Sequence, residues 1–471
     1  MADGGGRRSG LALAIVIVGI GLVMLDSTAV NVALPVFRDS LGADDAQLSW
    51  VITGYVLASG ISLIPAGRLG DRIGHKPVFL IGLAVFTLAS LWCGLAQSAE
   101  ELVVARVVQG FGGGIYYPTV TSFIQVLYSG RARGRAFGLM GSVIGLTTAL
   151  GPLVGGVCIE LFGVAEGWRW IFFINIPIGV IAFVAGLLLL PRGRVPGEQR
   201  SGLDPFGILL VSVGLVFVTL PLVQSGDPGW PAIGWGLIPV GIAVLVGFFL
   251  WERRVQRRGR APLVPPHLFR HRSFTGGVIN GTAFFAAFTT IFFVLSIYWQ
   301  STLGFSAMET GLMMVPNSLA SVAGAFLSER ATHRFGRGVL VIGAGAVAAG
   351  LIMLTAVVVL VPAVEMNWLT VFIPTVIVGF GTGLFIAPNT QFIVSTVDVV
   401  EAGAAAGVVS TVQRLGSAIG IAIIGAVFFG VSAAAGPVVA VPVALAVSAL
   451  LSIMRRVYPA PAGPPSGRLV P

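Results

Sequence analysis

The sequence predicts an all-α integral membrane protein with fourteen transmembrane helices, and three observations support this fold class. Hydrophobic residues make up 56% of the 471 residues and charged residues only 10%, whereas about 25% of the residues in soluble domains are charged. Apolar segments of roughly 20 residues, the length that crosses about 30 Å of hydrocarbon, recur along the chain. Lysine and arginine concentrate in alternate connections between these segments, as the positive-inside rule expects.

The apolar segments can be delimited in order. The expected spans are 11–35, 47–66, 78–97, 102–127, 136–162, 170–190, 205–224, 232–251, 273–299, 311–328, 339–361, 368–394, 403–432 and 436–454. The first segment is too long, and too polar at its far end, for a cleaved signal peptide. We therefore expect it to remain as a membrane helix.

The basic residues predict the orientation. Of the 28 Lys and Arg residues, 24 lie on the side of the N-terminus, two (Arg38 and Arg169) on the other side, and two (Arg106 and Arg414) within spans. Both termini are therefore expected in the cytoplasm. The lopsided use of arginine, 27 Arg against one Lys, suggests a bacterial source, so the expected membrane is the bacterial inner membrane. The basic run 252–260 is interpreted as a topology signal and a contact with membrane lipid, and not as a nucleic-acid site.

The longest basic connection divides the chain into eight spans before it and six after it. We predict an N-terminal six-helix bundle (11–190), two inserted helices (205–251), a cytoplasmic basic linker (252–272), a C-terminal six-helix bundle (273–454) and a cytoplasmic tail (455–471). The connection GRLGDRIGHK at 67–76 recurs in degraded form as SERATHRFGRG at 328–338. Repeated halves around a midplane cavity are typical of secondary transporters.

Three charged residues lie well inside spans: Asp26, Arg106 and Arg414. Each costs about 2.5 to 3.5 kcal/mol at a helix centre, so each needs a partner or a water-lined cavity. A buried carboxylate that alternately meets a cavity and a partner can bind and release a proton. The alternative is that Asp26 only fixes helix packing.

Helical spacing places Arg106, Gln109, Gly113 and Tyr117 along one face of the fourth span. A cation, an amide and a phenol on one stripe suit a polar cavity wall. A nearby arginine would stabilise the ionised form of Asp26, although the sequence does not show whether the two are close.

Other chemistry is not expected. The chain has no GxxxxGK[ST] phosphate loop, and GFGTG at 379–383 lies within an apolar span and not after a strand. Cys93 and Cys158 lie within spans and are interpreted as packing residues, while His267 and His271 have no third ligand nearby. We therefore predict no metal, no cofactor and no enzymatic activity.

Five segments of the N-terminal half resemble the major facilitator superfamily, and more narrowly its family of 14-spanning drug:proton antiporters. They are LDSTAVNVALP from Leu25, GRLGDRIGHK from Gly67, RVVQGFGGG from Arg106, GLTTALGPLVGG from Gly145 and WRWIFFINIPIG from Trp168, and QRLGSAIGIAI from Gln413 adds a match in the C-terminal half. The resemblance implies the major facilitator fold of two six-helix bundles, here with two inserted helices.

The resemblance also implies roles for individual residues. Asp26 and Arg106 would couple transport to protons. The gating loop would comprise Gly67, Asp71, Arg72, Gly74 and Lys76, with Asp71 near residues 403–407 at the start of the thirteenth span. The antiporter bend would comprise Gly145, Gly151, Pro152, Gly155 and Gly156, whose small residues can equally serve close helix packing.

The expected function is proton-coupled export of hydrophobic or weakly cationic drugs by a monomer using alternating access. Candidate cavity residues are Asn31, Gln109, Tyr117, Asn280, Tyr298, Asn317, Asn389, Gln413 and Arg414, for which helix–helix hydrogen bonding is an equal alternative. The twelfth span, which contains GFGTGLFIAPNTQFI, has amides but no acid, which argues against a dicationic substrate. Two alternative functions are a carrier of the same fold for a lipid or metabolite, and a non-transporting sensor or scaffold.

Overall fold

The computed structural model describes residues 3–163, 165–191, 204–223, 231–258, 262–299, 303–305, 307–394, 397 and 402–435, and within these ranges the chain contains helices and no strand. The long helices are α1 (Asp3–Leu41), α2 (Asp45–Ile73), α3 (His75–Leu95), α4 (Ala99–Leu127), α5 (Gly130–Phe162), α8 (Pro205–Val223), α9 (Leu237–Arg257), α10 (Arg272–Ile297), α11 (Ala307–Phe335), α12 (Gly338–Leu360), α13 (Trp368–Val394) and α14 (Ala402–Ala435). Two shorter helices, α6 (Gly167–Phe173) and α7 (Asn175–Leu189), follow one another, and the 3₁₀ helices are η2 (Ala232–Gly236), η3 (Pro266–Arg270) and η5 (Ala363–Glu365).

The helices follow the expected spans from 11 to 432, and most of them extend beyond the apolar segments. Among the described residues, ten helical segments, one combining α6 with α7 and one combining η2 with α9, are long and apolar enough by composition to cross a membrane, so the chain is a multi-pass membrane protein. The sixth expected span is divided between α6 and α7. The expected fourteenth span, 436–454, and the tail, 455–471, lie outside the described residues.

Helix ends follow from local chemistry. The carboxylate of Asp44 accepts the backbone N–H of Gln47 at 2.7 Å, and the Gln47 side chain accepts the Asp44 N–H in return, which is a capping box at the start of α2. At the other end of α2, Gly74 has φ +97°, and Gly336 after α11 has φ +54°. Only glycine adopts these angles without strain, so both copies of the repeated connection turn at a glycine.

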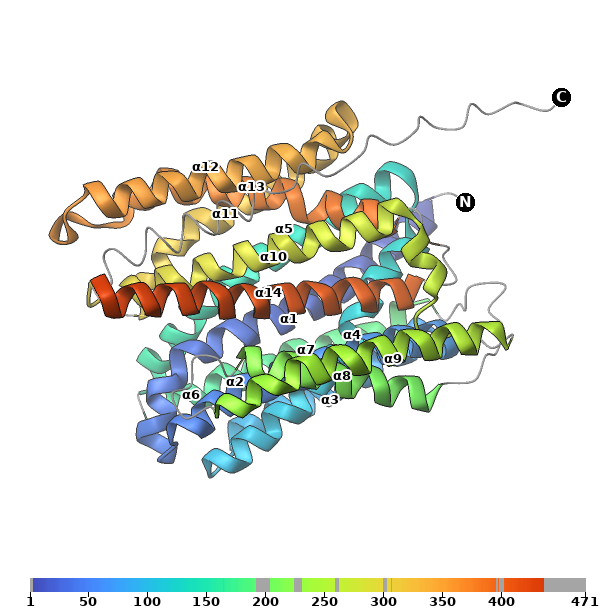
Figure 1. Ribbon diagram of the computed structural model, residues 1–471, viewed down its shortest axis with the longest axis horizontal. Coiled ribbons are helices and arrows are strands. Elements are labelled where there is room, and N and C mark those ends of the chain that lie inside the picture. The colour runs from blue at the N-terminus through green and yellow to red at the C-terminus, as the bar shows by residue number, and fades with distance from the viewer. Residues whose placement is uncertain are drawn as a thin grey trace.

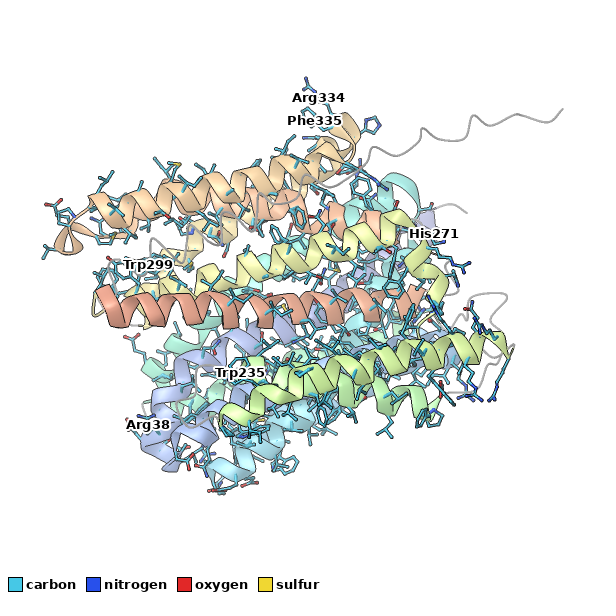
Figure 2. All side chains as sticks on the ribbon, viewed as in Figure 1. Arg38, Trp235, His271, Trp299, Arg334 and Phe335 are labelled. Atoms are coloured by element: carbon cyan, nitrogen blue, oxygen red, sulfur yellow. The ribbon has the colours of Figure 1, made fainter. Side chains whose placement is uncertain are left out.

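The helices form two groups, which Figure 1 shows lying along a common long axis. Helices α1 to α7 pack with one another, as do α10 to α14, while α8 and α9 pack against each other and α8 contacts α2 and α14. The labelled Arg38, Trp235 and Trp299 lie toward one end of the molecule, and His271 and Arg334 lie toward the other (Figure 2).

The two groups meet mainly along two helix pairs, α5 with α11 and α2 with α14, and also where α5 contacts α13 and α4 contacts α14. Glycines face the partner on the first pair: a Cβ on Gly138 would lie 3.0 Å from the Ala325 carbonyl oxygen, and one on Gly145 would lie 3.0 Å from the Ser321 hydroxyl. On the second pair, a Cβ on Gly407 would lie 2.8 Å from the carbonyl oxygen of Leu63. Small residues thus let the backbones of the two halves approach closely.

Glycines also allow close helix contacts inside each half. A Cβ on Gly110 of α4 would collide with the carbonyl oxygen of Tyr55 on α2, and one on Gly379 of α13 would collide with that of Asn317 on α11. Four residues further along, Gly114 and Gly383 make the matching contacts with Ser59 and Ser321. These contacts place α2 and α4 in correspondence with α11 and α13, which identifies the halves as structural repeats.

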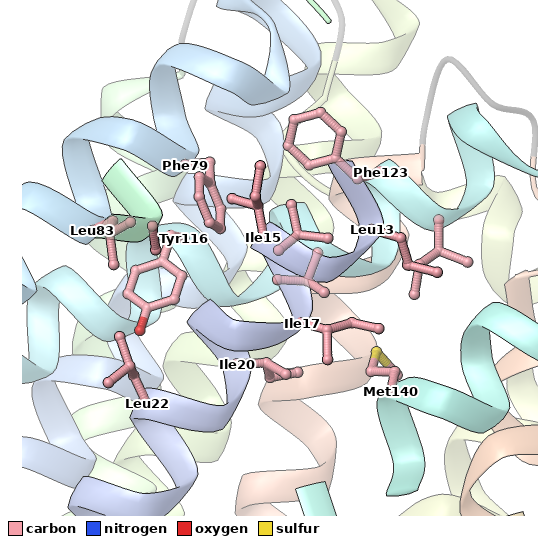
Figure 3. Packing of buried hydrophobic residues seen from close by; sticks show 14 of the residues in the cluster. Leu13, Ile15, Ile17, Ile20, Leu22, Phe79, Leu83, Tyr116, Phe123 and Met140 are labelled. Carbon is pink, nitrogen blue, oxygen red and sulfur yellow. The ribbon is translucent and has the colours of Figure 1, made fainter. Parts of the chain in front are cut away.

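The hydrophobic core is divided in the same way. Within the N-terminal half, aromatic and aliphatic side chains from α1, α3 and α4 pack together, including Phe79, Tyr116 and Phe123 (Figure 3). Within the C-terminal half, the buried cluster centres on Phe284 and Phe385, whose rings stack with centroids 4.1 Å apart. Helices α8 and α9 contribute Val211, Leu215 and Phe248 to a further cluster with the linker and α14.

Candidate proton site and substrate surface

A buried ion pair lies within the N-terminal half. The Nη1 atom of Arg106 on α4 donates to Oδ2 of Asp26 on α1 at 2.6 Å, and both side chains are at most 2% exposed. The two residues stand 80 positions apart in the sequence. Opposite charges in contact offset part of the cost of placing each in an apolar environment.

Two amides complete the set of donors around the carboxylate. Oδ1 of Asp26 accepts from Nε2 of Gln109 and from Nδ2 of Asn175, each at 2.9 Å. Gln109 Nε2 also donates to Ser90 Oγ at 2.8 Å, and its Oε1 accepts from Arg106 Nη1 at 2.6 Å. The carboxylate therefore accepts hydrogen bonds from three residues, and no second acid lies beside it among the described residues.

The guanidinium of Arg106 is held on its remaining sides. Its Nε donates to the carbonyl oxygen of Val51 at 3.2 Å. Its Cζ lies 4.1 Å from the ring centroid of Tyr55 and 5.7 Å from that of Phe172. Aromatic faces stabilise a desolvated cation by about 2 kcal/mol. Arg106 is thus fixed by α1, α2 and α6 together.

A break in the sixth span positions Asn175. Pro177 has no N–H to bond the carbonyl four residues earlier, so the helix is interrupted after Phe173 and α7 begins at Asn175. The Asn175 side chain is fully buried and reaches Asp26 and Ser90. The interruption thereby brings a third donor to the carboxylate.

The gating-loop residues lie at the end of α2 and the start of α3. Asp71 is 4% exposed, and its carboxylate lies 3.8 Å from Arg68 Nη1 and 3.9 Å from His75 Nε2. Gly67 is buried, Arg72 is exposed and Gly74 makes the turn. Lys76 Nζ donates to the carbonyl oxygens of Leu187 and Leu190 at 2.8 Å, which joins this loop to the end of α7.

The residues of the antiporter bend lie on α5, which runs from Gly130 to Phe162 with Pro152 inside it. Gly145 faces Ser321 of α11, Gly151 lies against Thr28 of α1, and Pro152 lies beside Gly311 of α11. Gly155 is buried and Gly156 is half-buried. This segment therefore lies where the two halves meet.

The candidate cavity residues do not form one cluster. Gln109 belongs to the Asp26 network, and Tyr117 lies beside Arg414, whose Cζ is 5.9 Å from the Tyr117 ring centroid. The others are spread over several helices. Asn31 is exposed and donates to the backbone of its own helix, Asn317 is buried where Gly379 packs on α11, and Gln413 is half-buried on α14. Asn280 is buried on α10, Tyr298 is buried just after α10, and Asn389 donates to the carbonyl oxygen of Gly277.

Several residues of the site could not be singled out from the sequence. Ser90 and Tyr55 belong to no recognisable sequence motif. The fold brings Ser90 to Gln109 and Tyr55 to Arg106. Asn175 lies in the segment WRWIFFINIPIG, two residues before Pro177. The proline indicates a helix break, which could have drawn attention to the amide beside it. The Cys93 thiol, interpreted as packing, donates to Gln109 Oε1 at 3.5 Å.

Two helical repeats joined by an inserted helix pair, with a buried charge pair in one repeat, define a membrane transporter of the secondary type. The sequence comparison agrees, because the family model of the Major Facilitator Superfamily matches residues 16–421. The chain therefore belongs to the major facilitator superfamily. It is a transporter and not an enzyme.

Relatives that are similar to this chain over most of its length are named as antibiotic transporters or resistance proteins. The chain is 37% identical to the probable actinorhodin transporter of Streptomyces coelicolor, over 90% of this chain and 73% of that protein. It is 32% identical to the tetracenomycin C resistance and export protein of Streptomyces glaucescens, over 87% and 74% of the two chains. Among solved structures, the human organic anion transporter MFSD10 superposes with a TM-score of 0.66 at 15% identity, covering 95% of this chain and 98% of that chain.

Proposed function

We propose that the protein exports hydrophobic small molecules across a bacterial inner membrane in exchange for protons, with both termini in the cytoplasm. The observation that carries this proposal is the buried Asp26–Arg106 pair with its amide donors. The relatives from Streptomyces, which are named for antibiotic export or resistance, support the export direction.

The geometry suggests how a proton could act. In the described conformation the carboxylate of Asp26 is bound by Arg106, Gln109 and Asn175. A proton on Asp26 would remove its charge and leave Arg106 without a counterion, so protonation would favour a different packing of α1 against α4. Alternation between the two packings would couple proton entry to opening of one face.

The energy of one proton is sufficient for concentrative export. A proton moving down 100 mV supplies about 2.3 kcal/mol, and each unit of pH gradient adds about 1.4 kcal/mol. Together they correspond to a concentration ratio of several hundred. One titrating carboxylate in the N-terminal half therefore suffices.

The test uses purified protein in liposomes with an imposed pH gradient and a panel of neutral, monocationic and anionic lipophiles. Asp26→Asn should abolish gradient-driven exchange. Because this variant leaves Arg106 buried without a partner, the double variant Asp26→Asn/Arg106→Gln keeps the site neutral and separates loss of coupling from loss of folding. Undiminished exchange in either folded variant would show that the coupling site lies elsewhere.

A further inference from the structure

A second buried carboxyl group lies outside the Asp26 network, toward the end of the inserted helix pair. Glu252, in the last turns of α9, is 0% exposed. Its Oε2 accepts the backbone N–H of Val264 in the linker at 2.8 Å, whereas its Oε1 has no hydrogen-bond partner in the described part of the chain. A buried carboxylate oxygen without a donor costs far more than the oxygen of a neutral carboxyl group.

Another carboxyl group, that of Asp204, lies close to this unpartnered oxygen. A Cβ built on Gly207 of α8 would lie 2.7 Å from Oδ2 of Asp204 and 2.9 Å from Oε1 of Glu252. The two oxygens are therefore within about 6 Å of each other, a distance at which like charges disfavour ionisation. Because residue 207 is a glycine, no side chain on it separates them.

The hydrogen-bond donors are shared unequally between the two acids. Oδ1 of Asp204 accepts the backbone N–H of Gly207 at 3.0 Å, at the start of α8, and Oδ2 accepts from Nε1 of Trp251 at 2.6 Å. The N-terminus of a helix also favours a negative charge. Asp204 therefore has the surroundings of a charged carboxylate, and Glu252, with a single backbone donor, has those of a neutral acid.

The neighbouring cations do not offset a charge on Glu252. The groups that act on it electrostatically are Asp204 and, more weakly, Arg68 of α2, which lies 3.8 Å from the carboxylate of Asp71. Arg253 and Arg254, which follow Glu252 on α9, are exposed. An ionised Glu252 would thus be buried beside a second negative charge without an ion-pair partner of its own.

We propose that Glu252 and Asp204 form a second proton-binding site, in which Glu252 holds the proton on Oε1 and Asp204 remains charged. The ligand is a proton, taken up on the side of the molecule where the linker lies. The inference concerns a different group from Asp26 and does not depend on the exchange proposed above. It adds a response to pH in the helix pair that is inserted between the two halves.

The site can affect both halves because Glu252 holds the linker. The linker around Val264 lies in a buried cluster that also contains residues of α2, α10 and α14. Its members from the linker and from these helices include Leu263, Leu268, Ile64, Phe274 and Ala405. Loss of the proton would place repulsion at the residue that fixes the linker to α9. The linker should therefore pack less firmly against the two halves as the pH rises.

Infrared difference spectra of the full chain in nanodiscs test the site directly, because a protonated carboxyl group has its own carbonyl band. Subtracting the spectrum of Glu252→Gln from that of the unmodified chain isolates residue 252. The difference should contain the band at about pH 6, well above the value of about 4.3 at which an ordinary glutamate titrates. Its absence there would overturn the proposal.

Two further variants make the assignment specific. Glu365→Gln changes an exposed glutamate of η5 and is the matched control, so its spectrum at about pH 6 should retain the band. Asp204→Asn keeps a side chain that can cap α8 but removes the neighbouring charge, so the band should disappear at a lower pH than in the unmodified chain. An unmoved titration would show that the two acids do not share a site.

Thermal unfolding measures the same proton independently. A folded chain that holds a proton released on unfolding loses stability as the pH rises, from about 4.3 to the pH at which the band disappears. Glu252→Gln can still accept the Val264 N–H but has no such proton, so its midpoint should fall less over this range. Equal falls would contradict the proposal. Neither measurement involves transport, so a failure of the proposed export would leave both results unchanged.

Discussion

The two halves of the molecule share their helix contacts and differ in what occupies their centres. In the N-terminal half the contact of Gly110 with Tyr55 lies beside Arg106, while in the C-terminal half the matching contact of Gly379 with Asn317 has Thr375 at the arginine position. Phe284 on α10, stacked on Phe385, is buried at the centre of its half as Asp26 is in the other.

The two structural repeats therefore share their helix packing but differ in the side chains at their centres. Glycine–backbone contacts occur at matching positions in both halves, so the helix packing does not require the charges. The buried acid and its paired arginine lie in one half, and buried aromatic rings pack in the core of the other. Under the proposed function, the proton-binding carboxylate would lie in the first repeat, and the second repeat would contribute apolar packing.

The largest effect is expected from placing a charge in the aromatic half. Phe284→Asp would bury a carboxylate among Phe285, Phe288 and Phe385 with no donor set comparable to that of Asp26. An unpaired buried charge costs several kcal/mol, so folded protein should be lost in size-exclusion chromatography. Phe284→Leu should fold, and wild-type behaviour of the aspartate variant would contradict the assignment.

The shared glycine contacts should be equally sensitive in both halves. Gly110→Ala and Gly379→Ala each place a Cβ against a backbone carbonyl oxygen. Each should destabilise the protein by about 1–3 kcal/mol, as overpacking does, measured as a lowered midpoint of thermal unfolding. Gly247→Ala, where a Cβ meets nothing within 4 Å, is the control. A strong effect in one half alone would contradict the inference that the two contacts are equivalent.

A smaller effect is expected from removing one donor to the carboxylate. Asn175→Ala deletes a hydrogen bond of 2.9 Å to Asp26. The buried carboxylate loses one of its three donors, which should cost about 1.5 kcal/mol, measured as a lowered midpoint of thermal unfolding. Asn389→Ala, which removes a buried amide with a longer bond of 3.4 Å to the Gly277 carbonyl oxygen in the other half, should lower the midpoint less; an equal fall would mean that the two amides act alike.

The smallest effect is expected at the exposed ion pair between the halves. Arg135 Nε lies 2.8 Å from Glu329 Oε2, and the arginine side chain is 75% exposed. Arg135→Ala should change stability by less than about 1 kcal/mol, with the effect falling further at high salt. The midpoint of thermal unfolding at low and high ionic strength measures it. A loss comparable to that of Asn175→Ala would indicate that this pair controls the transition.

The helix pattern could be predicted from the sequence because composition and hydropathy are local properties. Asp26 and Arg106 were identifiable as costly charges, but their contact depends on how α1 and α4 pack across 80 residues. The matching strings QGFGGG at 109–114 and VGFGTG at 378–383 are visible in the sequence. That these strings mark corresponding helix contacts could be seen only from the packing of Gly110 on Tyr55 and of Gly379 on Asn317.

The row of glycines on α5 has a consequence for the temperature dependence of transport. Where Gly138, Gly141 and Gly145 meet α11 and α13, the contacts involve backbone and short side chains. Because interlocked side chains resist displacement in a close-packed interface, a row of glycines leaves fewer side chains to rearrange when one half moves over the other. We therefore expect transport to slow only weakly on cooling, which transport rates measured over a range of temperatures would check.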